Sequence, residues 1–224
     1  MKKITLSALL FVSTYSFSQS CAGFYYLQNN KTVEITITNK KGKEVGKNIY
    51  TVANVQRSAS TVTATVNSEF VASNGKSVSK ATNVIKCTNG IIMMDLKMFI
   101  PSTQQEQTGT SASGGGEAYL EYPANMKEGD VLKDGQFSMD YKTSAGLNGH
   151  MIVEITNRKV EGKESVTTPA GTWDCFKITY HSKVGIKIVV NIPTNSDVTE
   201  WYAPGFGVVK TESNNGKTEI TSVK

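Results

Sequence analysis

Apolar and polar residues alternate along most of this chain. Between residues 33 and 38, valine and isoleucine occupy every second position, with glutamate or threonine between them. The same period of two recurs in residues 61–70, 151–156, 173–180 and 186–190. Such alternation places one set of side chains on a buried face and the other in water, which is typical of antiparallel sheets. The pattern therefore predicts an all-β, mostly antiparallel protein with little helix.

Turn signals separate these alternating runs. Asn74-Gly75 and Asn89-Gly90 are dipeptides that accept positive φ at both central positions of a hairpin. Counting the runs between such signals gives roughly ten to twelve strands. No run alternates with a long amphipathic helix, which argues against a parallel sheet built from βαβ units. We therefore expect one barrel-like or strongly curved sheet.

The first 18 residues have the pattern of a signal peptide. Lys2 and Lys3 precede a short apolar run, and small residues follow it at alternate positions. We predict a signal peptide at 1–18 and a single all-β domain at 19–224. Within that domain, the polar segment 101–117 contains three consecutive glycines and is expected to form a flexible loop. The alternative for this segment is a lid over a pocket.

The charge of the chain argues against one class of partner, nucleic acids. The formal net charge is +5, and loss of Lys2 and Lys3 with the leader lowers it to +3. We expect this small surplus to be spread along the chain. The lysine-rich stretch 39–43 contains a glycine and no aromatic residue, so it is expected to be a solvated hairpin tip. The sequence therefore predicts no nucleic-acid partner.

The three cysteines predict a disulfide. An exported chain meets oxidising conditions, so we expect two of Cys21, Cys87 and Cys175 to be bonded, with the pairing left open. A lipid on Cys21 would tether the protein to a membrane and would leave Cys87 to pair with Cys175. Ser18 stands where lipoprotein processing normally has an aliphatic residue, which favours the unlipidated form.

The sequence contains no recognisable catalytic arrangement. His150 and His181 are its only histidines, and each is expected to be a polar residue at a strand end. The motifs of nucleophile elbows, zinc proteases and dithiol redox sites do not occur. We therefore assign no catalytic residue, no metal ligand and no cofactor. Trp173, Trp201 and Tyr202 are the candidates for ligand contact, and core packing is the alternative for all three.

Two motifs in the second half of the chain carry a family resemblance. Residues 167–178 read TTPAGTWDCFKI, and residues 201–210 read WYAPGFGVVK. Together with Tyr122-Pro123 and the early Cys21, they resemble the exported TapB-like family, a group of unknown function common in Bacteroidota. The resemblance implies an exported β protein of the envelope and assigns no reaction or residue role. The Pro and Gly residues of both motifs are expected to specify tight turns and the packing of a hairpin.

These observations together predict a non-enzymatic protein of the cell envelope. We expect it to be periplasmic or envelope-associated, and an outer-membrane lipoprotein if Cys21 carries a lipid. A curved sheet without catalytic groups suits the binding of an apolar small molecule, a lipid or a peptide in its concavity. One alternative is a structural or interaction module that uses a sheet face or edge. The other is a hydrolase with an unrecognised pair of acidic residues.

Overall fold

The computed structural model describes residues 21–100, 112–113, 118–142, 146–188 and 191–224. In these residues thirteen strands form one antiparallel sheet in the order β6-β8-β9-β10-β11-β12-β13-β1-β2-β3-β4-β5-β7. The strands are β1 (Thr32–Asn39), β2 (Glu44–Arg57), β3 (Thr61–Ala72), β4 (Ser77–Thr88), β5 (Ile91–Asp95), β6 (Ala112–Ser113), β7 (Tyr119–Tyr122), β8 (Gly135–Lys142), β9 (Asn148–Thr168), β10 (Gly171–Lys187), β11 (Asn191–Ala203), β12 (Gly207–Ser213) and β13 (Gly216–Val223).

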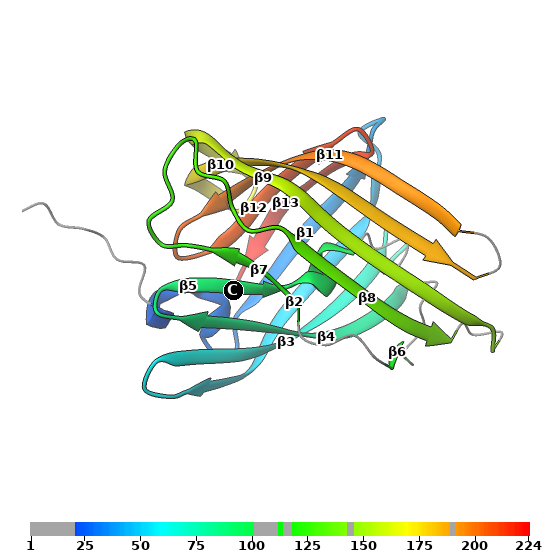
Figure 1. Ribbon diagram of the computed structural model, residues 1–224, viewed down its shortest axis with the longest axis horizontal. Coiled ribbons are helices and arrows are strands. Elements are labelled where there is room, and N and C mark those ends of the chain that lie inside the picture. The colour runs from blue at the N-terminus through cyan, green and yellow to red at the C-terminus, as the bar shows by residue number, and fades with distance from the viewer. Residues whose placement is uncertain (1–20, 101–111, 114–117, 143–145, 189–190) are drawn as a thin grey trace, which may run out of the picture.

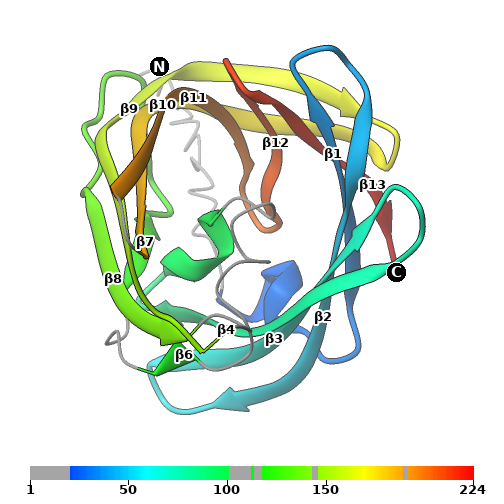
Figure 2. The same ribbon diagram turned by 90° about the vertical axis from the view of Figure 1, so that its right-hand side faces the viewer.

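The sheet curls into a nearly closed barrel (Figures 1 and 2). Two short 3-10 turns, η2 (Tyr25–Leu27) and η3 (Leu96–Phe99), lie inside the ring of strands that Figure 2 shows. The predicted all-β, antiparallel, barrel-like fold is confirmed. The two-residue strand β6 falls within the expected loop 101–117. The rest of that loop and the leader 1–18 lie outside the described residues.

Arg158 joins the two edges where the sheet fails to close. Its Nη1 donates hydrogen bonds to the carbonyl oxygen of Glu121 on β7, at 3.1 Å, and to that of Lys133 just before β8, at 2.9 Å. Gly135 allows the edges to approach, because a Cβ at this position would lie 2.6 Å from a methyl carbon of Leu120. A guanidinium and a glycine therefore close a seam that the backbone ladder leaves open.

A β-bulge in β9 turns Arg158 toward the interior. Thr179 of β10 pairs with Lys159 and His181 pairs with Thr156, so two residues of β9 face Tyr180 alone. Asn157 makes this possible by adopting a left-handed conformation with φ of 57°. Before the bulge the odd-numbered residues of β9 are buried, and after it the buried residues are the even-numbered Arg158, Val160, Val166 and Thr168. Bulges commonly re-aim a side chain in this way.

Several predicted turns are confirmed in detail. Asn89 and Gly90 have φ of 51° and 80°, as a tight hairpin turn requires, whereas at Asn74-Gly75 only the glycine has positive φ. In the Ala203-Pro204-Gly205 motif, the Phe206 amide donates to the Ala203 carbonyl oxygen at 3.0 Å. The Phe206 ring then packs on Trp173, with 4.4 Å between centroids. The two family motifs therefore meet in one packed corner of the barrel.

The cysteine pairing is now defined. Cys21, in the 3-10 turn η1 (Cys21–Gly23), is bonded to Cys87 on β4, and Cys175 is a buried free thiol. Because the Cys21 sulfur is used in this bond, the same sulfur cannot also carry a thioether-linked lipid. The pairing of Cys87 with Cys175 that lipidation would require is not the one found. Among the described residues, no helix has the length and apolar character needed to span a bilayer.

Candidate functional site

The barrel encloses an apolar cavity of about 490 Å³. Its walls come from β1, β2, β5 and β9–β13, and η3 contributes to it from inside the barrel. The alternation of β1 explains part of the lining, because Ile35 and Ile37 line the cavity whereas Glu34 and Thr36 do not. The apolar lining residues are Tyr26, Ile35, Ile37, Val45, Tyr50, Met94, Met98, Phe99, Ile100, Ile155, Tyr180, Val198 and Val208.

Polar side chains, uncharged apart from Lys217, line one end of this cavity. Thr211 and Thr218 share a hydrogen bond of 2.8 Å across β12 and β13, and Asn215 donates to the Ser196 hydroxyl at 2.6 Å. Asn215 is exposed, whereas Tyr26 at the other limit of the cavity is buried. The cavity therefore opens to solvent beside the β12–β13 turn. We call this opening the mouth.

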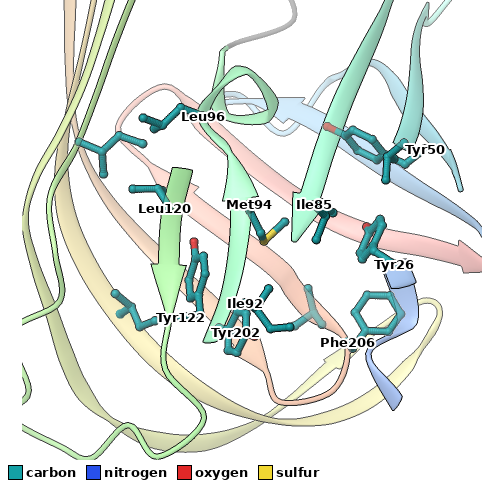
Figure 3. Close-up of a cluster of buried hydrophobic side chains, with 14 of the residues drawn as sticks. Tyr26, Tyr50, Ile85, Ile92, Met94, Leu96, Leu120, Tyr122, Tyr202 and Phe206 are labelled. Atoms are coloured by element: carbon teal, nitrogen blue, oxygen red, sulfur yellow. The ribbon is translucent and has the colours of Figure 1, made fainter. Parts of the chain in front are cut away.

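Aromatic residues close the opposite end. Tyr26 of η2 packs edge-on against Tyr50 and Phe206, with ring centroids 6.4 and 5.8 Å away (Figure 3). Burial raises the pKa of the Tyr26 phenol well above its usual value, so this side chain remains neutral. The disulfide at Cys21 ties the segment that carries Tyr26 to β4. The floor of the cavity is therefore apolar and covalently anchored.

A buried charged pair lies behind the cavity wall. Arg158 and Glu200 are both 0% exposed, and the Arg158 guanidinium lies 4.8 Å from the centre of the Tyr122 ring. Tyr122 in turn stacks on Tyr202 with 4.4 Å between centroids. Burial raises the pKa of Glu200 to about 7, and the Arg158 charge and the Tyr122 hydroxyl act against that rise. Tyr180 connects this cluster to the cavity, because it lines the cavity and its hydroxyl interacts electrostatically with both Glu200 and Arg158.

Glu200 should make the stability of the protein depend on pH. Its pKa is raised from 4.5 to about 7 on folding, so the folded state holds a proton that the unfolded state releases between these values. Stability must then fall as pH rises through this window, by at most about 3 kcal/mol. Between pH 4.5 and 7.5, we expect urea unfolding to show that the free energy of unfolding of wild type falls by about 3 kcal/mol more than that of Glu200→Gln. A difference that stays constant with pH would contradict the assignment, and Glu44→Gln, an exposed site, is the control.

The three aromatic residues proposed from the sequence lie outside the cavity lining. Trp173 packs on Phe206 in the motif corner, and Tyr202 stacks on Tyr122. Trp201 lies between two lysines, with Lys210 Nζ 4.6 Å and Lys177 Nζ 5.9 Å from its ring, and its indole nitrogen donates to Glu164. The contacts of all three aromatic residues are therefore with neighbouring side chains and not with the cavity.

The two histidines form cross-strand pairs with aspartates. His150 Nδ1 lies 2.7 Å from Asp140 Oδ1, and His181 Nδ1 lies 2.9 Å from Asp197 Oδ1. Both pairs sit on exposed positions, and neither histidine lines the cavity. In the part of the chain that the structure describes, no three His, Cys, Asp or Glu side chains gather as metal ligands would.

The chemistry of the cavity is that of a binding site. Among its described lining residues there is no aspartate or glutamate, so the lining offers no acid pair for hydrolysis. Alternation in the sequence indicates the inner residues of β1, but it does not single out Arg158 or Glu200. The signal for Arg158 is weak, because the period of two before it places residue 158 on the solvent-facing side unless the bulge at Asn157 is known.

Comparison with known proteins defines the family. Residues 28–224 match the sequence pattern described as DUF3108-like. The chain belongs to the DUF3108-like family. The narrower TapB-like name expected from the motifs is not confirmed by this match. No curated protein shows significant similarity to the chain.

Two crystal structures share the DUF3108-like fold of this chain. One is a candidate exported protein with a YmcC-like fold from Bacteroides fragilis, which is 21% identical with a TM-score of 0.75. The other is a candidate lipoprotein from Parabacteroides distasonis, which is 22% identical with a TM-score of 0.74. Each match covers 90% of this chain and 98% or 99% of the other. The likeness therefore extends over the whole barrel.

Proposed function

We propose that this protein is exported to the cell envelope and binds an apolar ligand inside its barrel. The leader-like sequence at 1–18 and the Cys21–Cys87 disulfide support export, because disulfides persist in oxidising compartments. The two structural neighbours, one described as a candidate exported protein and the other as a candidate lipoprotein, support the same location.

The observation that carries the proposal is the cavity itself. A volume of about 490 Å³ lies within the range of small-molecule sites, which are typically 300–1,000 Å³ and mainly apolar. Well-packed interiors leave few voids larger than a water molecule, so a space of this size is unusual for a purely structural core. The lining favours an apolar molecule or chain over a peptide, because Lys217, the charged residue among the described lining residues, lies beside the β12–β13 turn and is already paired with Glu219.

The interaction-module alternative has less support. A docking face would be expected to present a contiguous apolar patch. In the described ranges of the chain, Val131 and Leu147 are the large hydrophobic residues that are exposed. Two side chains do not form such a patch, whereas the interior offers a continuous apolar surface.

Filling the cavity should abolish ligand uptake. Val198 lines the cavity on β11 and is only partly buried, so the larger side chain of Val198→Trp can occupy the open volume. We expect the fluorescence of N-phenyl-1-naphthylamine, an uncharged apolar probe, to rise on binding to wild type. Its affinity for Val198→Trp should be at least about tenfold lower.

The matched control is Val131→Trp, which adds the same side chain at an exposed position outside the cavity. Circular dichroism and urea unfolding of both variants would verify that the barrel is intact. Equal probe affinity in wild type and Val198→Trp, or no binding to wild type, would refute the proposal.

A further inference from the structure

Exposed lysines gather on the turns around the mouth of the cavity. The tip of the β1–β2 hairpin carries Lys40, Lys41 and Lys43, and the β3–β4 turn carries Lys76. Lys142 and Lys187 end β8 and β10 at the same end of the barrel, which faces the viewer in Figure 2. Six lysines therefore lie on this rim, with the exposed Glu44 beside Lys43.

The two hairpins that carry most of these lysines are attached to the cavity wall. Asn39 and Val45, on either side of the lysine-rich tip, both line the cavity. The Asn39 side chain accepts hydrogen bonds from the amides of Lys41 and Lys43, at 2.9 and 3.2 Å, which fixes the shape of the tip. The Ser73 amide donates to the Val45 carbonyl oxygen at 2.9 Å and holds the β3–β4 turn alongside.

The lysines of these two hairpins form no ion pair with an acidic side chain, a property that they share with Lys127 and Lys163 of the closed end among the described residues. Within the described residues, none of Lys40, Lys41, Lys43 and Lys76 takes part in an ion pair, whereas Lys210 and Lys217 pair with glutamates on their own strands. The absence of an ion pair at any one of these lysines is explained by ordinary solvation of a surface side chain. Four unpaired cations beside an apolar opening create a local positive potential that each would not create alone.

One loop at the opposite end of the barrel carries charges of both signs. The loop between β7 and β8 carries Lys127 and Lys133 together with Glu128, Asp130 and Asp134. Lys133 is paired with Glu121 at 2.7 Å. The lysines of this loop are therefore accompanied by acidic residues, whereas the tip of the β1–β2 hairpin carries three lysines beside one glutamate, Glu44.

We propose that the ligand is an amphiphile with one acyl chain and an anionic head, either a carboxylate or a phosphate. This inference rests on the proposed function and names its ligand class. The chain occupies the apolar cavity, the threonines and serines of the mouth surround the junction, and the head lies among the rim lysines. A free fatty acid and a lysophospholipid share this chemistry. Screening in salt confines the attraction to charges within about 10 Å, so a head at the mouth benefits and a distant anion does not.

The test compares ligands that have the same chain and different heads. Palmitate, palmitoyl-lysophosphatidylglycerol and uncharged hexadecanol would each be titrated against the N-phenyl-1-naphthylamine complex of the full chain at low salt. We expect both anionic ligands to displace the probe at about tenfold lower concentration than hexadecanol, an advantage that 0.5 M salt largely removes. The anionic ligand that binds more tightly shows whether the head group is the carboxylate of a fatty acid or the phosphate of a lysophospholipid.

The rim is tested with the triple variant Lys40→Gln, Lys41→Gln and Lys43→Gln. We expect it to lose about tenfold in affinity for the anionic ligands and to bind hexadecanol as wild type does. The matched control replaces three lysines of the closed end, Lys127, Lys133 and Lys163, with glutamine and should leave all affinities unchanged.

The outcomes separate this inference from the proposed function. If hexadecanol and the anionic ligands bind wild type equally, or if the triple variant keeps its preference for anions, the charged head is refuted and the apolar site stands. If none of the three ligands displaces the probe, the acyl-chain occupant is refuted as well.

Discussion

Replacing Arg158 with methionine is expected to lower the free energy of unfolding by about 3–5 kcal/mol, the usual cost of removing one partner of a buried charged pair. The substitution removes the two hydrogen bonds that hold the carbonyl groups of Glu121 and Lys133 together across the seam. It also leaves the fully buried Glu200 without a nearby positive charge. Urea unfolding at pH 7.5 would measure the loss.

Two further variants identify the origin of this loss. Arg57→Met removes an exposed guanidinium that donates one hydrogen bond to the Leu27 carbonyl oxygen, and it should cost no more than about 1 kcal/mol. The double variant Arg158→Met with Glu200→Gln should recover part of the stability, because the remaining buried group is then neutral. If Arg158→Met costs no more than Arg57→Met does, the seam does not depend on the guanidinium.

Loss of the disulfide should lower the free energy of unfolding by a similar amount. Cys21 and Cys87 are 66 residues apart, and in the chain-entropy model closing a loop of that length stabilises a protein by about 4 kcal/mol. We therefore expect Cys87→Ser to unfold at a markedly lower urea concentration than wild type. The same shift should appear when wild type is measured in a reducing agent.

Cys175→Ser is the control for this experiment, because Cys175 is also buried but has no partner. Burial and the charges of Asp174 and Glu164 raise its pKa to about 12, so the thiol is neutral at the pH of the assay. Adding a reducing agent should leave the stability of Cys87→Ser unchanged and should lower that of Cys175→Ser. Equal stability of oxidised and reduced wild type would contradict the prediction.

The sequence predicted the fold well because alternation is a local property. The period of two in residues 33–38 separates Ile35 and Ile37, which line the cavity, from Glu34 and Thr36, which do not, although Thr36 is buried as well. Asn89-Gly90 forms the expected tight turn. Neither signal depends on distant contacts. The same is true of the Ala203-Pro204-Gly205 turn, whose hydrogen bond spans only four residues.

The site could not be predicted in the same way. Alternation shows that a strand has two faces but not which face meets a cavity, so the outward Trp201 was as good a candidate as any inner residue. Arg158 and Glu200 come together only through the bulge and the closing of the barrel. The lysine rim likewise forms from hairpin tips that are more than 30 residues apart in the chain and adjacent only in the folded sheet.

The bulge at Asn157 also affects how distant structural neighbours can be aligned with this chain. The buried positions of β9 are odd-numbered before it and even-numbered after it, so the strand carries two phases of the same repeat. A relative that lacked the extra residue would match one part of β9 correctly and would have every later side chain on the wrong face. At about 21% identity, β9 is therefore best aligned as two separate segments that meet at Asn157.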